Sequence, residues 1–487
     1  MKGRVLIIFV SKQAQDPGAS VTGSRLAVCD ARTLKSLKEF ENIAADQSGQ
    51  SVADGRAFLG VDEHKGYIGT SNGIYVYHAE TMETGAQIPG TGNASGDLYS
   101  DQTGTMLRVG SRVFAVHQKN GIVVIDAETD VVQTTVGAPK DGSNQRGYGS
   151  VVLSKDGNLW CSVAGDVSGS GAAQDYLIKL DPWTLDTTRV ALPAGYAVPN
   201  SWYAWTADGF CSSRQENKLY WKNNGEWFSS TKIYVYDIDG GKASVLYDLA
   251  DYDDGGWGLY GAGFRVNPET NDIYASLFRH FGTPEYRTIK LNPATNAVTT
   301  YEMNDHYWFP AMPVFPDKHA PVVSAELTDV SLTKGTRIYL GDKVTDADNM
   351  DAAIVKTILP GYNDALLSAT IENDSLTLTP YAAGRTALSL RFNSNGKVVT
   401  KELTIVVEPG TGLPGSRANH ISVYPNPFTD YLMIEATREG TVELVDLAGK
   451  SLLRTTVGSG SNRIGTTSLP QGVYLLKYGS RTVKVVK

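Results

Sequence analysis

The sequence predicts an all-β protein, because three features of its pattern favour strands. Short hydrophobic runs alternate with polar residues, which is typical of strands that bury one side. Asp or Asn stands between many paired runs, where its side chain can bond backbone N–H groups two residues further on and so form a turn. A strand–turn–strand unit of this kind recurs about every fifty residues over roughly the first three hundred.

The repeated unit predicts a β-propeller. Six units are found, with turn residues Asp30, His78, Asp126, Asp181, Asp237 and Asn292, at intervals of 48, 48, 55, 56 and 55 residues. A period of this length that contains only strands is typical of four-stranded propeller blades. Each unit supplies the third and the outer strand, and two inner strands precede it. We expect six blades, or seven if the full-length protein starts earlier; a stacked, non-circular β-array is the alternative.

The predicted propeller spans residues 1–318 and closes by joining its two ends. Residues 307–315 have no partner strands of their own, so we expect them to complete the blade that begins with 5–10 and to leave no open sheet edge. The apolar run 5–10 is too short for the core of a signal peptide. We interpret it as a strand, and we expect that the chain is trimmed or begins at an internal methionine, with the signal peptide absent.

Composition excludes several classes of protein. With 44 Lys and Arg against 52 Asp and Glu, the 487 residues carry a net charge of −8, which argues against a nucleic-acid partner. No apolar run approaches the ~20 residues that span a bilayer, so we expect no membrane-spanning segment. Cys29, Cys161 and Cys211 form neither a disulfide framework nor a metal cluster. Seven histidines, none in an HExxH arrangement, exclude zinc hydrolases of that type.

Two smaller β-modules are predicted after the propeller. Residues 319–408 alternate in polarity over 375–379, 387–391 and 403–407, which suits an immunoglobulin-like β-sandwich without its cysteine pair. Residues 409–417 have the composition of a flexible linker. The last module covers 418–487.

Two acidic runs are weighed as calcium half-sites, because clustered carboxylates suit hard cations. One is Asp346-Ala-Asp348-Asn349, which follows the predicted propeller. The other lies in a propeller loop and consists of Asp251, Asp253 and Asp254. We interpret both as solvated turns and assign no metal site.

The C-terminal module carries four motifs in order. They are Val423-Tyr-Pro-Asn-Pro-Phe428, Val445-Asp-Leu-Ala-Gly-Lys450, Leu469-Pro-Gln-Gly-Val-Tyr-Leu-Leu476 and a basic end at Lys484-Val-Val-Lys487. Residues 418–487 thereby resemble the C-terminal sorting domain of the type IX secretion (Por) system. The resemblance implies export, attachment at the outer-membrane surface or release outside the cell, and the secretion machinery as a partner. An ordinary second β-sandwich is the alternative.

The repeated Tyr-Val-Tyr-Asp units with Asp/Asn-Pro-x-Thr turns resemble the YncE-like, surface-layer-type propellers of Bacteroidota. In a propeller, the loops between blades and those between the second and third strands share one face, and here these loops are long. They are rich in aromatic residues, which suit flat ligands and sugars. We predict a ligand surface made of Arg146, Tyr148, Tyr196, Trp202, Tyr203, Trp227, Phe228, Trp257, Tyr260, His280, Phe281, Tyr307 and Trp308. Alternatively, several of these rings cap the propeller's own channel, as we expect of Trp205 and Trp221.

We therefore expect a secreted, surface-displayed, ligand-binding protein. The resemblance extends to surface cobalamin-binding propellers that hand corrinoid to an outer-membrane transporter, although those are lipid-anchored and this chain has a sorting tail. Adhesion to glycan or protein and a surface-layer role are alternatives. The enzyme alternative is a metal-dependent lyase or lactonase, with His280 and His306 in candidate positions. No Ser-His-Asp spacing or phosphate-cradling loop is found, so we assign no catalytic residue and no cofactor.

Overall fold

The structure is a computed structural model. It describes residues 6–12, 24–30, 32–33, 35–40, 43–44, 55–70, 72–92, 103–117, 121–137, 148–163, 174–199, 209–222, 231–280, 285–303, 315, 317–409, 421–436, 439–447, 449–478 and 481–487. The chain forms two compact units. The first comprises Met1–Leu327, Tyr339–Thr357 and Leu390–Lys401, and the second comprises Thr328–Ile338, Ile358–Ser389 and Glu402–Lys487.

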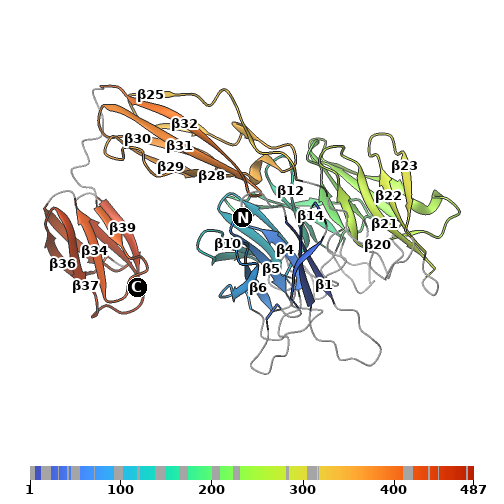
Figure 1. Ribbon diagram of the computed structural model, residues 1–487, viewed down its shortest axis with the longest axis horizontal. Coiled ribbons are helices and arrows are strands. Elements are labelled where there is room, and N and C mark those ends of the chain that lie inside the picture. The colour runs from blue at the N-terminus through green and yellow to red at the C-terminus, as the bar shows by residue number, and fades with distance from the viewer. Residues whose placement is uncertain are drawn as a thin grey trace. The chain divides into compact units, whose positions relative to one another are not determined.

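Six antiparallel sheets, blades 1 to 6, precede residue 304 in the described part of the chain (Figure 1). Blade 1 contains β1 (Leu6–Lys12), β2 (Ser24–Asp30) and β3 (Ser36–Phe40). Blade 2 contains β4 (Gly55–Gly60), β5 (Lys65–Thr70), β6 (Gly73–His78) and β7 (Glu83–Gln87). Blade 3 contains β8 (Thr103–Val109), β9 (Arg112–His117), β10 (Gly121–Asp126) and β11 (Val131–Val136).

The other three blades repeat the same plan. Blade 4 contains β12 (Tyr148–Leu153), β13 (Leu159–Val163), β14 (Tyr176–Leu180) and β15 (Thr187–Ala191). Blade 5 contains β16 (Phe210–Ser212), β17 (Lys218–Lys222), β18 (Lys232–Asp237) and β19 (Lys242–Asp248), after which comes the short 3₁₀ helix η1 (Leu249–Asp251). Blade 6 contains β20 (Gly258–Val266), β21 (Ile273–Arg279), β22 (Glu285–Leu291) and β23 (Val298–Glu302).

The blades are arranged as a propeller. Strands within each blade pair in sequence order, and the first strands of successive blades contact one another, from β1 to β4, β8, β12, β16 and β20. The all-β propeller prediction is therefore confirmed. Residues 307–314, predicted to close the ring, lie outside the described residues. Phe315 is described, and its ring packs edge-on against Tyr274 of β21 with 5.3 Å between ring centroids.

The inner strands of a blade are buried on both faces, because alternate residues enter the cores that the blade shares with its two neighbours. On β10, Ile122 and Val124 belong to the core between blades 3 and 4, whereas Val123 and Ile125 belong to the core between blades 2 and 3. The outer strands are polar and largely exposed, as in β15. Burial on both faces is possible because successive side chains of a strand point to opposite sides.

The predicted turn residues hold the third and outer strands of a blade together. Asp181 Oδ1 accepts hydrogen bonds from the backbone N–H groups of Trp183 (2.7 Å) and Thr184 (2.9 Å). Four residues beyond the aspartate, Leu185 adopts a left-handed backbone with φ 66°, and its N–H donates to the Asp181 carbonyl at 3.0 Å. The same side-chain caps are found at Asp30, Asp126 and Asn292.

Residues 317–409 form strands in three sheets and one 3₁₀ helix. A pair is made by β24 (Val322–Val323) and β27 (Val344–Thr345), which η2 (Asp351–Ala353) follows. A four-stranded sheet contains β25 (Val330–Leu332), β32 (Lys397–Val407), β31 (Gly384–Ser394) and β28 (Val355–Ile358), and a three-stranded sheet contains β26 (Thr336–Tyr339), β30 (Ser375–Pro380) and β29 (Leu367–Glu372). The immunoglobulin-like assignment and the domain boundaries stay predictions.

The C-terminal module is a small two-sheet sandwich. One sheet contains β33 (Ile421–Tyr424), β34 (Tyr431–Ala436) and β37 (Gly460–Gly465), and the other contains β36 (Ser451–Val457), β35 (Gly440–Val445), β38 (Val473–Tyr478) and β39 (Arg481–Val486). Both contribute to one core around Phe428, Leu444 and Leu476. Among the helices of the described residues, none is long and apolar enough to cross a membrane.

We predict that Asp181→Ala destabilises the full chain, because two backbone N–H groups of the turn lose their acceptor. The expected loss is about 1 kcal/mol in the free energy of unfolding, measured by chemical denaturation. Asp181→Asn is the matched control, because the amide keeps the acceptor oxygen and Asn292 already fills the equivalent position. Equal losses in the two variants would show that the side-chain cap does not stabilise the turn.

Candidate functional site

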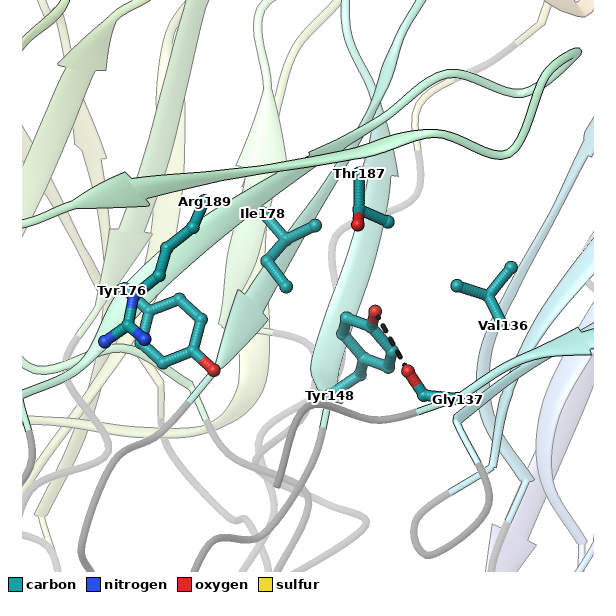
Figure 2. Close-up of a pocket in the computed structure, with 7 residues that line it drawn as sticks. All are labelled: Val136, Gly137, Tyr148, Tyr176, Ile178, Thr187 and Arg189. Atoms are coloured by element: carbon teal, nitrogen blue, oxygen red, sulfur yellow. Dashed lines mark hydrogen bonds between the residues drawn. The ribbon is translucent and has the colours of Figure 1, made fainter. Parts of the chain in front are cut away.

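A hollow of ≈ 350 Å³ lies between blades 3 and 4. Seven residues line it, six from β11, β12, β14 and β15 and one, Gly137, directly after β11. They are Val136, Gly137, Tyr148, Tyr176, Ile178, Thr187 and Arg189 (Figure 2). Tyr148 and Tyr176 are the first residues of their strands. The hollow therefore reaches from these strand starts, next to the predicted ligand-face loops, along β14 and β15 to Thr187 at the other end of the blade.

Strand geometry explains why these side chains converge. Tyr176 and Ile178 are two residues apart on β14, as are Thr187 and Arg189 on β15, so each pair projects from one side of its strand. The register pairs Ile178 with Arg189 and Leu180 with Thr187, which places both sets on the same side of blade 4. The wall of the hollow is thus built from paired strands.

Arg189 brings a positive charge to the hollow. Its guanidinium carbon lies 3.8 Å from the centroid of the Tyr176 ring, and Figure 2 shows the two side chains overlapping. The Arg189 side chain is exposed, whereas Tyr176 is buried. Stacking on the ring favours one orientation of the guanidinium, a group that presents up to five N–H donors and suits carboxylate or phosphate.

Tyr148 is the predicted site residue that lines the hollow. Its ring belongs to the core between blades 3 and 4, and its hydroxyl donates a long hydrogen bond to the Gly137 carbonyl at 3.4 Å. Burial raises the pKa of Tyr148 far above its usual value, so the hydroxyl stays protonated at any physiological pH. The side chain can therefore act as a neutral donor or acceptor.

The groups that line the hollow suit recognition of a ligand. None of its seven described lining residues is a carboxylate, histidine or cysteine. It combines a cation, two tyrosines and small apolar surfaces, which suits a small anionic molecule or a sugar with an acidic group.

Three other predicted site residues fall in the described structure, all away from the hollow. Tyr196 is half-buried and packs against Tyr234 of blade 5, with 4.8 Å between ring centroids. His280 is exposed at the end of β21 with a left-handed backbone, φ 57°. Trp257 is only 2% exposed and belongs to the core between blades 5 and 6.

Two arginines cover Trp257. The guanidinium carbons of Arg279 and Arg287 lie 4.5 and 4.4 Å from the ring centroid. Asp254 pairs with Arg279, and Asp253 pairs with Arg287 at 2.6 Å. The hydrogen bond from Arg279 lowers the pKa of Asp254, and the bond to Asp253 raises the pKa of Arg287. In this part of blade 6, Trp257 is therefore buried beneath two arginines, and Asp253 and Asp254 have arginine partners.

The remaining predicted site residues lie outside the described residues. They are Arg146, Trp202, Tyr203, Trp227, Phe228, Phe281, Tyr307 and Trp308, and with them Trp205, His306 and the side chain of Tyr260. Trp221, expected in the channel, is instead fully buried in the core between blades 4 and 5, and its Nε1–H donates to the Ala197 carbonyl at 2.9 Å.

Sequence reasoning missed Tyr176, Thr187 and Arg189, because it searched loops and these residues belong to strands. A signal was available. Arg189 is the one arginine in the outer strand of blade 4, and the strand paired with it begins with an aromatic residue. To recognise that Arg189 lies beside Tyr176 required the strand register, which places residues from two strands side by side.

Metal-binding geometry occurs elsewhere in the first unit. Within the described residues, two groups of acidic or histidine side chains bring their ligand atoms within 4.8 Å of one another: Glu269, His319 and Asp348, and Asp317, Asp346 and Asp348. Asp346 is only 1% exposed, so the solvated turn expected there is wrong. Its neighbours in space come from a segment about thirty residues earlier in the chain.

Solved structures similar to this chain share low sequence identity with it. A quinonprotein alcohol dehydrogenase-like protein from Bacteroides thetaiotaomicron is 13% identical with a TM-score of 0.41, over 57% of this chain and 60% of that one. The extracellular domain of a hybrid two-component system from the same organism is 10% identical with a TM-score of 0.37, over 96% and 54%. The WD40 domain of Neurospora crassa Pan2 is 12% identical with a TM-score of 0.36, over 60% and 86%. The chain thus spans little more than half the length of the first two.

Two family models match separate parts of the chain. Residues 422–487 match the secretion system C-terminal sorting domain, so the protein is exported by type IX secretion to the cell surface or beyond it. No protein of curated function matches the sequence significantly. Residues 6–316, well over half of the chain, match the family described as Domain of unknown function (DUF5074), and the chain belongs to that family.

Proposed function

We propose that this protein is a cell-surface or secreted binding protein that captures an acidic saccharide in the hollow between blades 3 and 4. The stack of Arg189 on Tyr176, beside the buried hydroxyl of Tyr148, carries the proposal. An arginine suits the carboxylate or sulfate of such a ligand, and the aromatic and aliphatic walls suit the apolar face of a sugar ring.

The size of the hollow favours a small ligand. At ≈ 350 Å³ it is close to the lower end of the ~300–1,000 Å³ typical of small-molecule sites. One or two ring-sized groups fit such a volume. Because the walls come from paired strands, the site is rigid before the ligand arrives, which lowers the entropic cost of binding.

A corrinoid is the alternative ligand. It rests on the resemblance to YncE-like surface propellers and on the aromatic residues of the predicted ligand face, most of which lie outside the described part of the chain. Such a protein would pass the corrinoid to an outer-membrane transporter. A corrinoid is much larger than the hollow, so it would have to bind mainly on the loops. The enzyme alternative finds no support in the hollow, whose described lining residues include no carboxylate and no histidine.

We predict that the full chain binds acidic glycans and that Arg189→Ala weakens this binding about ten- to a hundredfold, as expected for one charge-assisted contact. A glycan array carrying uronic-acid, sulfated and neutral sugars identifies the probe, and calorimetry measures its affinity. Arg463→Ala is the matched control, because Arg463 also stacks on a tyrosine, Tyr431, at 4.1 Å, but in the sorting domain. Equal weakening by the two variants, or no acidic glycan bound, would contradict the proposal.

Arg189→Lys tests which property of the arginine matters. Lysine keeps the charge and loses the planar fork and the stack, so we expect an affinity between those of the wild type and Arg189→Ala. Binding should also weaken as salt is raised, because the contact is electrostatic.

A parallel titration with cyanocobalamin and cobinamide tests the corrinoid alternative. We expect no heat at micromolar protein if the ligand is an acidic sugar. Tight corrinoid binding that Arg189→Ala leaves unchanged would instead place the ligand on the loops and overturn the proposal.

A further inference from the structure

Three carboxylates from two segments that lie about thirty residues apart meet in the first unit. Asp317 follows the propeller strands, and Asp346 and Asp348 lie in the turn between β27 and η2. One ligand oxygen from each lies within 4.8 Å of the others. All three are shielded from water: Asp346 is 1% exposed, and the side chains of Asp348 and Asp317 are 2% and 19% exposed.

Asp346 has one satisfied and one unsatisfied oxygen. Its Oδ1 accepts hydrogen bonds from the N–H groups of Asp348 (2.7 Å) and Asn349 (2.9 Å). Its Oδ2 is buried without a hydrogen-bond partner among the residues that the structure describes. A buried carboxylate oxygen with no partner destabilises the folded chain unless something compensates its charge. This orphaned oxygen is the observation that points to a missing ligand.

Nearby cations compensate only part of the charge of the cluster. Lys397 pairs with Asp317. Arg214 donates to the backbone carbonyl of Asp346 at 2.6 Å. Its charge is paired at 3.4 Å with the carboxylate of Asp351, which is not part of the cluster.

Asp348 is hydrogen-bonded to the neighbouring segment 318–319. Its carboxylate accepts from the N–H groups of Lys318 and His319, both at 2.6 Å, and from the exposed His319 ring at 3.1 Å. Within the described residues, neither the Asp346 nor the Asp348 carboxylate has a lysine or arginine side chain as its partner.

We propose that Asp317, Asp346 and Asp348 bind a divalent cation, and that this cation is Ca²⁺. An all-oxygen set of carboxylates is the donor chemistry that Ca²⁺ prefers. Ligands at about 2.3–2.6 Å on opposite sides of Ca²⁺ lie about 4.6–5.2 Å apart, which accommodates the span of the cluster. Mg²⁺ demands near-ideal octahedral geometry at about 2.0–2.1 Å and usually keeps several waters, so a set of protein carboxylates suits it less.

The second group is a weaker competitor for metal. Glu269 and His319 are both exposed, and Glu269 pairs with Lys318 at 3.2 Å. A histidine nitrogen would favour zinc over calcium. Zinc is therefore the comparison metal for the experiment.

The cation would join two segments of the first unit. Residues 317–319 leave the propeller, and residues 346–349 belong to the turn after β27. Since the protein is exported, millimolar calcium outside the cell would suffice for a site of the ~10⁻⁴–10⁻³ M affinity common in extracellular modules. Calcium would then hold the first segments after the propeller in place only outside the cell.

The test uses the full chain, freed of metal with a chelator and titrated with calcium chloride by calorimetry. We expect one Ca²⁺ per chain, weaker binding of Mg²⁺, and a melting temperature that rises with calcium concentration. Asp346→Asn keeps the shape and the Oδ1 hydrogen bonds but removes the charge, so calcium affinity should fall at least about tenfold.

The same variant separates a metal ligand from a structural residue. Without calcium, Asp346→Asn should melt at a higher temperature than the wild type, because it relieves an uncompensated buried charge. With calcium it should melt lower than the wild type. A merely structural aspartate would lower the melting temperature in both conditions, which would overturn the proposal.

Two further variants complete the experiment. Asp317→Asn, at the most accessible ligand, should also weaken calcium binding, and it serves if Asp346→Asn does not fold. Asp253→Asn is the control, because this carboxylate already pairs with Arg287 and should leave calcium affinity unchanged. Absence of calcium binding at 10 mM, about tenfold above the weakest expected dissociation constant, or binding of Zn²⁺ alone, would overturn the proposal.

Discussion

Every blade of this propeller depends on burying both faces of its sheet. A strand projects alternate side chains to opposite sides, so the two faces of one blade supply the two cores that it shares with its neighbours. Blade 4 shows this clearly: Cys161 and Ile178 enter the core with blade 3, and Trp160 and Leu177 enter the core with blade 5. A blade removed from the array would leave both of these faces exposed to water, which is why such repeats are stable only in series.

The same constraint places the candidate ligand site. Tyr148, Tyr176 and Ile178 all belong to the core between blades 3 and 4, and the hollow opens where that core ends. Their positions are therefore set by packing, and Arg189 is added from the outer strand through its stack on Tyr176. A site of this kind combines a rigid apolar wall with one charged side chain, which is the usual composition of a small-molecule site.

Two acidic runs of similar sequence have opposite surroundings. Asp253 and Asp254 meet arginines from β21 and β22, so their charges are neutralised within blade 6. Asp346 and Asp348 are more deeply buried and meet a third carboxylate, Asp317. Sequence alone ranks the two runs alike, because it shows the acids and hides the partners. The side chains that surround an acidic turn decide whether its negative charge is already balanced within the protein or calls for a cation.

The sequence by itself determined the all-β class, the six repeated blades, the Asp and Asn turns and the sorting tail. These follow from local signals, namely the period-2 alternation, turn residues at regular intervals and a contiguous motif set. Only the tertiary structure decided that Trp257 is covered by arginines, that Tyr176 and Arg189 share a hollow, and that Asp317 reaches Asp346. The reason is that each of these depends on strand register or on contacts between segments far apart in the chain, which no local pattern encodes.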